Sequence, residues 1–253
     1  VMARTSAYSH LWYVLCFEWQ EAWKRDEVIR AGTFLQDHNL WKRLISVHDW
    51  AFRPWAFSGQ TWPAYIPAQC GNEEKDLVKL NDYVTGLWSH SIPVLADEFG
   101  YEETDLMRSK VWVVFCSGAA GVGTGHHLKA FQRFLVQSRV PFQRMAPSND
   151  SVEAGGVTQF CIAEAGHHYV VYSTSGSFKL TVHGTALKGY WLNPRDVDGS
   201  LGTAFNVLAG TSTFTPPEVS KDWVLWVTDG TDLNSGVTHP SAGATVAQRV
   251  VGK

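Results

Sequence analysis

Short apolar runs alternate with longer, helix-like stretches from Leu11 to about Gln137, and this alternation limits the possible folds more than any other feature. The run LWYVLCF (11–17), for example, is typical of a strand buried on both faces, and a helix-compatible stretch follows it. Because strands joined by helices form right-handed βαβ units, this part of the chain predicts a parallel sheet. We expect its strands within 11–17, 43–50, 64–71, 91–100 and 122–125, and its helices within 21–38, 73–90, 105–121 and 127–138.

The pattern changes after Pro141, where short segments rich in β-branched and aromatic residues are separated by Gly, Pro, Asn and Asp. Such closely spaced segments predict an antiparallel β-sandwich. We expect its strands within 158–166, 167–176, 177–184, 187–199, 210–217 and 222–230. The sequence therefore predicts an α/β part at 1–138, a β-sandwich at 139–233, and a tail at 234–253 that is rich in Gly, Ser, Ala and Thr.

Composition excludes several classes of protein. With 45% apolar and 18% charged residues the chain has material for a packed core, and its net charge of −3 does not favour nucleic-acid binding. No apolar run approaches the roughly 18 to 20 residues needed to cross a bilayer, and the first ten residues do not resemble a signal peptide. We therefore expect neither a nucleic-acid partner nor a membrane anchor within these residues, and the sequence assigns no compartment.

Metal and disulfide chemistry are also not favoured. The four cysteines are widely spaced and form no C-x-x-C motif, which argues against a disulfide framework or a zinc site. The adjacent pairs His126–His127 and His167–His168 are poor chelates because neighbouring side chains diverge. We expect no metal.

Polar residues at the ends of the predicted parallel strands are the most informative feature. In parallel α/β folds the residues at the carboxyl ends of the strands face the ligand. Two of them, Glu18 and Glu98, are 80 residues apart (98 − 18) and could face each other as the two carboxylates of a glycoside hydrolase. The alternative is two unrelated acids in salt bridges. The strand-end residues are Glu18, His48 with Asp49, Gln69, Asp97 with Glu98, and His126.

The neighbours of these residues have alternative interpretations. Alternation along a strand predicts that Asp97 points away from Glu98, toward the helices. Glu21 could begin a helix, where a negative charge suits the dipole, or could line the site. His48, Asp49 and Trp50 could bind sugar hydroxyls or a catalytic carboxylate, or His48 could be structural.

The segment GAAGVGTG (118–125) superficially resembles a dinucleotide-binding turn between a strand and a helix. That fold places an acid roughly 20 residues further on, but there is no Asp or Glu between Leu106 and Asn149. We therefore expect no nucleotide cofactor and interpret the glycines as part of a tight strand. A Cys–His nucleophile is not favoured either, because Cys16 and Cys116 lie inside apolar runs.

Several segments in the same order resemble a known family. ARTSAYSHLWYVLCFEWQEAW, RLISVHDW, IPVLADEFGYE and CSGAAGVGTGHHLKAFQRFL are similar to the later part of an apiosidase-like glycoside hydrolase barrel, near family 140. PFQRMAPSND, FCIAEAGHHYVVYSTSGSF and GYWLNPRD resemble the small β-domain that accompanies those barrels. That β-domain carries a collagen-binding label, from which we infer no collagen binding.

The resemblance implies roles for two residues. LWYVLCFE matches the fourth barrel strand, whose terminal acid is the general acid/base, here Glu18; PVLADEFG matches the seventh, whose terminal glutamate is the nucleophile, here Glu98. The wider clan usually has Asn before the acid/base, where this chain has Phe17. A hydrogen bond to the 2-hydroxyl of the sugar would then come from Trp19, Gln20 or Glu21.

The resemblance to the apiosidase-like barrel begins just before the fourth strand of that barrel. A complete eight-stranded barrel takes about 200 residues or more, whereas about 137 residues precede the predicted β-domain. An open remnant would expose apolar surface and unpaired edges. We therefore expect a longer polypeptide or a partner chain to supply the missing strands.

Together these observations predict a partial (β/α)8 TIM-type barrel, strands four to eight, followed by an antiparallel β-sandwich. We expect a retaining glycoside hydrolase that acts on a carbohydrate substrate without a cofactor, with carboxyl groups about 5 to 5.5 Å apart. The alternatives are a non-catalytic carbohydrate-binding or scaffold protein, and an oxidoreductase that uses a nicotinamide. The residues expected at the site are Glu18 and Glu98 as catalytic groups, with Trp19, Glu21, His48, Asp49, Trp50, Gln69 and His126 as substrate contacts.

Overall fold

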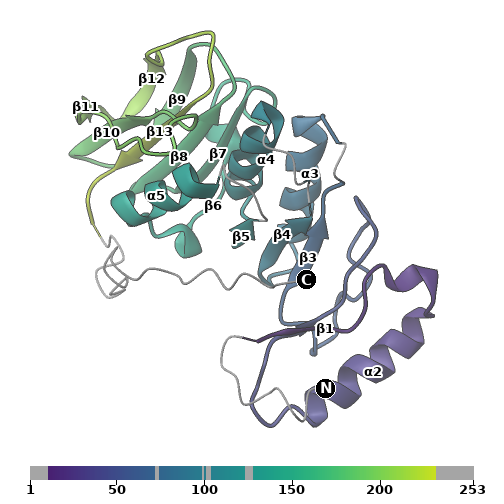
Figure 1. Ribbon diagram of the computed structural model, residues 1–253. Coiled ribbons are helices and arrows are strands. Elements are labelled where there is room, and N and C mark those ends of the chain that lie inside the picture. The colour runs from purple at the N-terminus through teal and green to yellow at the C-terminus, as the bar shows by residue number, and fades with distance from the viewer. Residues whose placement is uncertain (1–10, 72–73, 99, 101–103, 123–127, 232–253) are drawn as a thin grey trace.

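The computed structural model describes residues 11–71, 74–98, 100, 104–122 and 128–231 (Figure 1). The first half contains five short strands with helices between them. The strands are β1 (Tyr13–Val14), β2 (Ile45–Ser46), β3 (Ile66–Gln69), β4 (Val94–Glu98) and β5 (Gly121–Val122). The helices are the 3₁₀ turn η1 (Trp19–Glu21) and α2 (Arg25–Asp37), α3 (Leu77–Trp88), α4 (Asp105–Cys116) and α5 (Leu128–Ser138).

These strands are parallel and follow one another in space in sequence order. β1 pairs with β2, and β3, β4 and β5 form a three-stranded sheet. Two hydrogen bonds join β2 to the residues before β3: Ala64 N donates to Ile45 O at 2.8 Å, and Ser46 Oγ donates to Tyr65 O at 2.5 Å. The carboxyl ends of all the strands therefore share one edge, as the alternating pattern predicts.

Side-chain caps start the two helices that follow β3 and β4. The Asp76 carboxylate accepts hydrogen bonds from Val78 N and Lys79 N at the start of α3, and the Thr104 hydroxyl accepts one from Met107 N at the start of α4. Such caps satisfy backbone donors that have no partner within the helix. The chain therefore turns into a helix soon after each strand, which leaves the strand ends free to carry polar side chains.

The second half contains antiparallel strands. A six-stranded sheet has the order β11-β10-β13-β8-β7-β6, and a two-stranded sheet pairs β12 with β9. The 3₁₀ turns η2 (Phe142–Arg144) and η3 (Asn149–Ser151) precede β7. The strands are β6 (Ala146–Pro147), β7 (Gln159–Glu164), β8 (His168–Ser173), β9 (Phe178–Val182), β10 (Leu187–Leu192), β11 (Phe205–Val207), β12 (Gly210–Phe214) and β13 (Trp223–Thr228).

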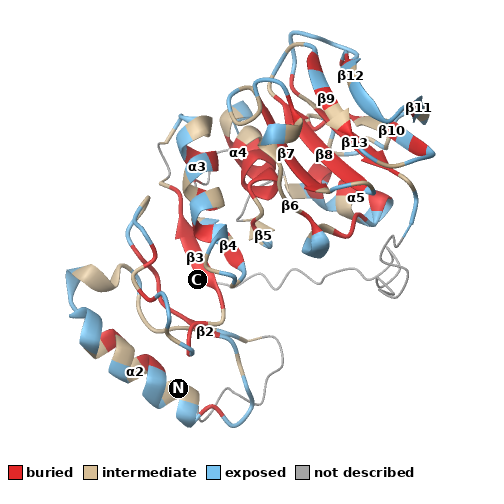
Figure 2. Cartoon of the chain, turned by 180° about the vertical axis from the view of Figure 1, so that it is seen from behind, coloured by how far each residue is buried: buried red, intermediate tan, exposed pale blue. Residues whose placement is uncertain are grey.

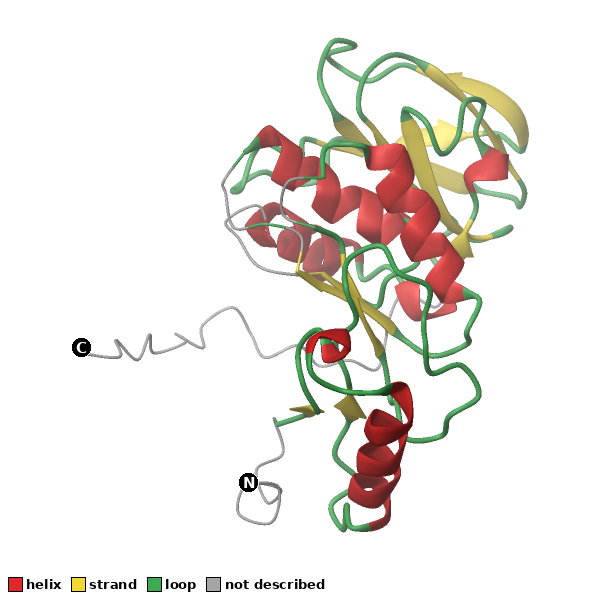
Figure 3. Ribbon diagram, turned by 90° about the vertical axis from the view of Figure 1, so that its right-hand side faces the viewer, coloured by secondary structure: helices red, strands yellow, loops and turns green. Residues whose placement is uncertain are grey.

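Helices separate the two sets of strands, as Figure 3 shows. α4 is buried over most of its length (Figure 2) because it packs between the parallel sheet and one face of the six-stranded sheet. Trp112 of α4 stacks on Tyr172 of β8, with ring centroids 6.3 Å apart. The other face of that sheet packs against β9 and β12 and forms a separate apolar cluster. Alternation along each strand accounts for the two apolar faces.

A buried ion pair also joins α4 to the antiparallel part. Arg108 of α4 donates from Nε to Asp222 Oδ2 at 2.7 Å and from Nη2 to Asp222 Oδ1 at 3.1 Å. Tyr172 Oη and Arg195 Nη1 also donate to the Asp222 carboxylate. The charged pair is therefore fully hydrogen-bonded where the two halves meet.

The structure corrects several strand predictions. β1 and β2 contain two residues each, although the apolar runs at 11–17 and 43–50 are much longer, so the rest of each run is irregular backbone. β6 and β11 were not predicted: β6 contains Pro147, and β11 is only three residues long. The predicted strand at 122–125 begins earlier, at Gly121, and its last three residues lie outside the described residues.

Two glycines of the GAAGVGTG segment are explained by close packing. Gly118 has φ of 90°, and a Cβ atom there would lie 2.6 Å from Trp88 Cδ1. Gly121 lies opposite Leu95 in the sheet, where a Cβ atom would lie 2.8 Å from Leu95 Cδ2. Gly118 therefore disfavours a side chain through both its positive φ and the Trp88 ring, whereas a side chain at Gly121 would require Leu95 to shift.

Among the described helices, none is both long and apolar enough to cross a membrane.

Candidate active site

Glu18 lies beyond the end of β1, in a strained backbone conformation. Its φ of 42° and ψ of 57° place it in the left-handed region, which is uncommon for any residue other than glycine. Hydrogen bonds from His48 N to Cys16 O and from Trp19 N to His48 O hold the residues on either side of it. Strain of this kind persists only where surrounding contacts enforce it, and it is often found at functional sites.

Gln69, at the end of β3, connects Glu18 to Glu98. Its Nε2 donates a hydrogen bond to Glu18 Oε1 at 2.9 Å. In the sheet, Gln69 lies directly opposite Glu98 of β4, and Cys70 N donates to Glu98 O at 2.8 Å. The carboxyl ends of β1, β3 and β4 thus bring the two predicted carboxylates to one edge, and both side chains are half-buried and open to solvent.

His48 follows β2 and is buried beneath these acids. Its Nε2 lies 3.2 Å from Asp97 Oδ1 and 3.8 Å from Glu98 Oε2. Burial of the imidazole acts to lower its pKa, but the hydrogen bond to Asp97 and the charges of Asp97, Glu98 and Glu18 outweigh this effect. The pKa of His48 is therefore raised, which favours an imidazolium among three carboxylates.

The position of Asp97 contradicts the sequence prediction. Simple alternation places its side chain toward the helices, whereas the structure places it against His48. The register explains the difference: Pro67 pairs with Leu95 and Gln69 with Glu98, so β4 has one more residue than β3 over this stretch. Such a bulge interrupts the alternation of side chains, so that consecutive residues reach the same site. The sequence pattern carries no clear signal of it.

Asp49 anchors the turn that follows Glu18. Its Oδ1 accepts hydrogen bonds from Trp19 Nε1 at 2.8 Å and from Gln20 Nε2. Burial raises the pKa of the Asp49 carboxyl, although the hydrogen bonds from Trp19 and Gln20 oppose this shift. The indole N–H of Trp19 is therefore engaged by protein, and Asp49 holds the η1 turn in place. The link from Gln20 to Asp49 was not foreseen, because side chains 29 residues apart carry no local pattern.

Four buried polar atoms at the site have no hydrogen-bond partner among the described residues. They are Oε1 of Gln20, Nδ1 of His48, Oδ2 of Asp49 and Oε1 of Gln69. Buried polar groups in proteins are nearly always paired, and an unpaired one requires an explanation. Bound water or a hydroxyl compound is one such partner.

The remaining predicted substrate contacts lie further out. Glu21 is exposed at the end of η1 and does not begin a helix, because α2 starts at Arg25; the turn around Trp19 displaces the helix start. Trp50 is also exposed, and the guanidinium of Arg53 lies 6.0 Å from its ring centroid. Glu21 N donates a backbone hydrogen bond to Glu18 O at 2.9 Å, but no described side-chain hydrogen bond or ion pair joins Glu21 or Trp50 to either catalytic candidate. His126 lies outside the described residues.

The arrangement suits acid–base and nucleophilic chemistry. A half-buried carboxylate lies on each side of Gln69, and an imidazole with a raised pKa lies within 3.8 Å of one of them. Within the described ranges, no group of three or more His, Cys, Asp or Glu side chains has a geometry that could hold a metal ion. The groups present can donate a proton, accept one, and attack an electrophilic carbon.

Comparison with known proteins identifies similar folds. No protein-family model and no curated protein sequence matches the chain. A glycoside hydrolase family 5 structure from Bacteroides vulgatus superposes with a TM-score of 0.62 and 13% identity, over 80% of this chain and 59% of that one. A second structure, described as a glycoside hydrolase, gives a TM-score of 0.59 and 14% identity, over 79% and 60%. The chain thus spans about 60% of the length of these structures and has a glycoside hydrolase-like fold.

Proposed function

We propose that this chain is part of a retaining glycoside hydrolase, with Glu98 as nucleophile and Glu18 as general acid/base. The proposal rests chiefly on one observation: Gln69 holds the Glu18 carboxylate and lies directly opposite Glu98 at the edge of the parallel strands. The likeness to glycoside hydrolase folds supports it. The resemblance to the apiosidase-like family stays a prediction.

The mechanism has two steps. In the first, the Glu98 carboxylate attacks the anomeric carbon while Glu18 donates a proton to the glycosidic oxygen, so the leaving group departs as an alcohol. Because Glu18 Oε1 accepts a hydrogen bond from Gln69, the transferable proton belongs on Oε2. In the second step, Glu18 accepts a proton from water, the water oxygen attacks the anomeric carbon, and the bond to Glu98 breaks.

His48 acts as a positioning residue in this scheme. It lies 3.8 Å from Glu98 Oε2 and 3.2 Å from Asp97 Oδ1. As an imidazolium it attracts the Glu98 carboxylate and orients it for attack. Asp97 orients the imidazole in turn.

The proposed substrate is a carbohydrate that lies along the shared strand edge. Trp50 offers an exposed aromatic face to a sugar ring, and Glu21 lies on the rim beyond Glu18. Trp19, Asp49 and Gln69 shape the floor through their hydrogen bonds. His126 is proposed for the same rim on sequence grounds alone.

We also propose that the parallel strands are strands four to eight of a barrel, with 1–138 as the catalytic part and 139–233 as an accessory β-domain. Large apolar side chains are exposed beside β1, α2 and β2, where the preceding barrel strands would lie. Further polypeptide, from the same chain or a partner, is proposed to cover them. The exposed residues are Trp12, Phe17, Trp23, Phe34, Leu40, Trp41 and Leu44.

Trapping of the covalent intermediate tests the proposal. A panel of activated 2-deoxy-2-fluoro glycosides should label Glu98, as intact mass and peptide mapping would show. Glu98→Gln should lower turnover of aryl glycosides by about 1,000-fold or more and abolish labelling. Glu153→Gln, a surface change in the antiparallel part, is the matched control and should leave both unchanged.

The stereochemistry of the product gives a second test. NMR of the first product should show the anomeric configuration of the substrate; an inverted product would remove the nucleophile role from Glu98. Glu18→Gln should slow aryl glycosides with poor leaving groups far more than those with good ones, because only the former need the acid. Carbohydrate binding without turnover or labelling would instead favour the non-catalytic alternative.

A further inference from the structure

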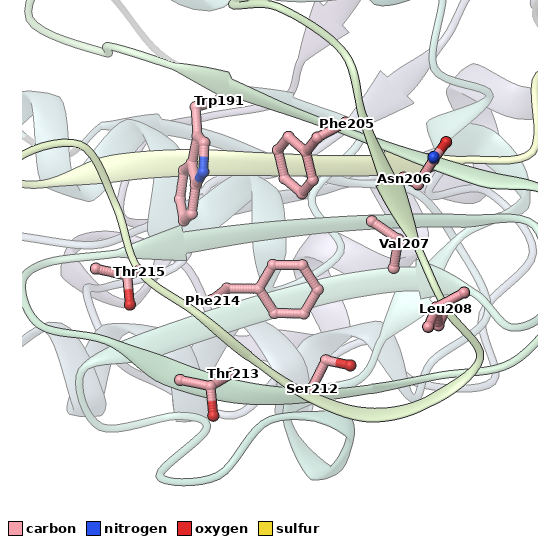
Figure 4. A pocket seen from close by; sticks show the side chains of 9 residues that line it. All are labelled: Trp191, Phe205, Asn206, Val207, Leu208, Ser212, Thr213, Phe214 and Thr215. Carbon is pink, nitrogen blue, oxygen red and sulfur yellow. The ribbon is translucent and has the colours of Figure 1, made fainter.

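A cavity lies in the antiparallel part, at the open corner between its two sheets (Figure 4). Its volume is about 360 Å³, and none of the described residues that line it is charged. β11 is at one edge of the six-stranded sheet and β12 at one edge of the two-stranded sheet, and the two are joined by Leu208 and Ala209. The backbone groups on the free side of each edge strand are therefore available to a ligand.

Three aromatic rings form the apolar part of this pocket. Figure 4 shows Trp191, Phe205 and Phe214 grouped around its middle, with Val207 and Leu208 on one side. Phe214 is buried and forms the floor, whereas Trp191 and Phe205 are only partly buried and pack at the margin of the apolar cluster. Both therefore keep ring surface that a ligand can contact.

The rings are fixed in place before any ligand binds. Trp191 packs edge-on against Phe178 and Trp223, with ring centroids 6.2 and 6.4 Å away. Phe205 lies on the backbone of Gly189, its partner residue in β10; a Cβ atom at Gly189 would overlap the Phe205 ring. A pre-formed aromatic surface loses little conformational entropy on binding.

The polar groups of the pocket are neutral. Ser212 pairs with the buried Leu180, so its side chain shares the inner face of β12 with Phe214. Thr215 also lines the pocket, and its hydroxyl forms a hydrogen bond with Ser177 Oγ at 3.0 Å. Asn206, in contrast, alternates with Phe205 and Val207, and its Oδ1 accepts a hydrogen bond from Lys188 Nζ on the other face. The ligand therefore meets aromatic faces, hydroxyls and backbone groups.

We propose that this pocket binds a sugar ring of an uncharged glycan, as a second carbohydrate site separate from the carboxylates. A sugar ring presents apolar C–H groups on its faces and hydroxyls at its edge, which matches aromatic rings surrounded by neutral hydrogen-bonding groups. The volume is at the lower end of the range for small-ligand pockets, about 300 to 1,000 Å³. The choice of a glycan rests partly on the proposed hydrolase function; the pocket itself does not.

Binding measurements on the full 253-residue chain test this proposal. The Glu98→Gln variant removes turnover, and affinity electrophoresis in gels containing a soluble β-glucan, a xylan or a galactomannan measures binding. We expect retardation by at least one of these polymers and none by polygalacturonate, which is charged. Trp191→Ala and Phe205→Ala should each weaken binding by about tenfold or more.

Trp41→Ala is the matched control, because it also removes an exposed indole but lies in the parallel part. Thermal unfolding identifies any variant that fails to fold. Ser212→Arg serves as the second variant, since it keeps all three rings but introduces a charge into the pocket and should also abolish retardation. Absence of retardation by every neutral polymer, or retardation unchanged in Trp191→Ala, Phe205→Ala and Ser212→Arg, overturns the proposal. The two proposals can also fail separately. If the wild-type chain shows neither turnover nor labelling of Glu98, but its retardation depends on Trp191, the glycan site in the pocket is supported and the hydrolase function is rejected.

Discussion

The parallel part has more unpaired buried polar atoms and more exposed apolar side chains than the antiparallel part. Of the buried polar side-chain atoms without a partner in the described residues, eight lie in the parallel part and two in the antiparallel part. Eight large apolar residues between Trp12 and Trp50 are exposed, whereas only Val157, Leu208 and Val219 are exposed in the described antiparallel part. The antiparallel strands pair over five or six residues in most cases, while β1 and β2 pair over two.

This contrast indicates different roles: the parallel part carries the candidate site, and the antiparallel part stabilises it. Strain at Glu18, the bulge before Glu98 and unpaired atoms on His48 and Gln69 all lie at the candidate site. Departures from ideal local structure are expected where a site needs them, and the stability they cost must come from elsewhere. Here the antiparallel sheet packs on α4 and α5, which also pack in the apolar cluster of the parallel strands, so it stabilises those strands through the helices. The strength of the coupling between the two parts can be measured by substitutions in each.

The largest expected effect on the free energy of unfolding comes from breaking the ion pair that joins the two parts. Arg108→Ala leaves the Asp222 carboxylate buried without its main partner, and should lower the free energy of unfolding by about 3 to 5 kcal/mol. Urea unfolding followed by tryptophan fluorescence measures this. Arg133→Ala removes an exposed pair with Asp198 and should cost about 1 kcal/mol or less. Two separate transitions in wild type would show that the parts unfold independently.

The same pair predicts a pH dependence. Burial acts to raise the pKa of Asp222, but the hydrogen bond and charge of Arg108 outweigh it and the pKa is lowered. A lowered folded-state pKa contributes stability above the ordinary value, and that contribution is lost as the pH falls through the folded-state pKa. The stability gap between wild type and Asp222→Asn should therefore be full near neutral pH and shrink in acid. A gap that widens in acid would contradict the ion pair.

The next effect concerns His48, within the parallel part. His48→Asn should lower kcat by about 100-fold through misplacement of Glu98, with little change in KM. Because the pKa of His48 is raised, its contribution to stability is full below the ordinary value of 6.5 and is lost as the pH rises through the raised value. The difference in Tm between wild type and His48→Asn should thus be larger at about pH 5.5 than at about pH 9. A larger difference at the higher pH would show that His48 is held as the neutral form.

The order of strands and helices in the parallel part, and the position of Glu18 and Glu98 after its strands, could be predicted from the sequence because they depend on local patterns. Apolar runs that end in Glu18 and Glu98 indicate parallel strands, and parallel strands bring their ends together. Three features depend on contacts distant in sequence and were not predictable: the left-handed backbone at Glu18, the bulge that turns Asp97 toward His48, and the strand β11. Each is decided by a partner strand, which a single run of residues does not reveal.

Replacing two helical glycines by alanine should have smaller effects on the free energy of unfolding, and the two effects should have opposite signs. A Cβ atom at Gly32 in α2 would overlap the Trp62 ring, so Gly32→Ala should destabilise the protein by about 1 to 3 kcal/mol. A Cβ atom at Gly86 in α3 would meet no other atom within 4 Å, and the residue is exposed, so Gly86→Ala should stabilise by about 0.5 to 1 kcal/mol. Chemical unfolding of both variants measures the difference. If Gly32→Ala did not destabilise the protein, the packing of α2 on Trp62 would be wrong; if Gly86→Ala destabilised it, the open surface at Gly86 would be wrong.

The smallest expected effect on stability is at the exposed apolar surface. Leu40 is 87% exposed, so Leu40→Gln removes no internal contact and should change the free energy of unfolding by less than about 0.5 kcal/mol. Because several neighbours are also apolar and exposed, the change should reduce self-association in sedimentation velocity. Val219→Gln, at an exposed residue of the antiparallel part, should change neither quantity. If Leu40→Gln destabilised the monomer while leaving its association unchanged, Leu40 would be packed within this chain, and the proposed covering of β1 and α2 by further polypeptide would lose its main support.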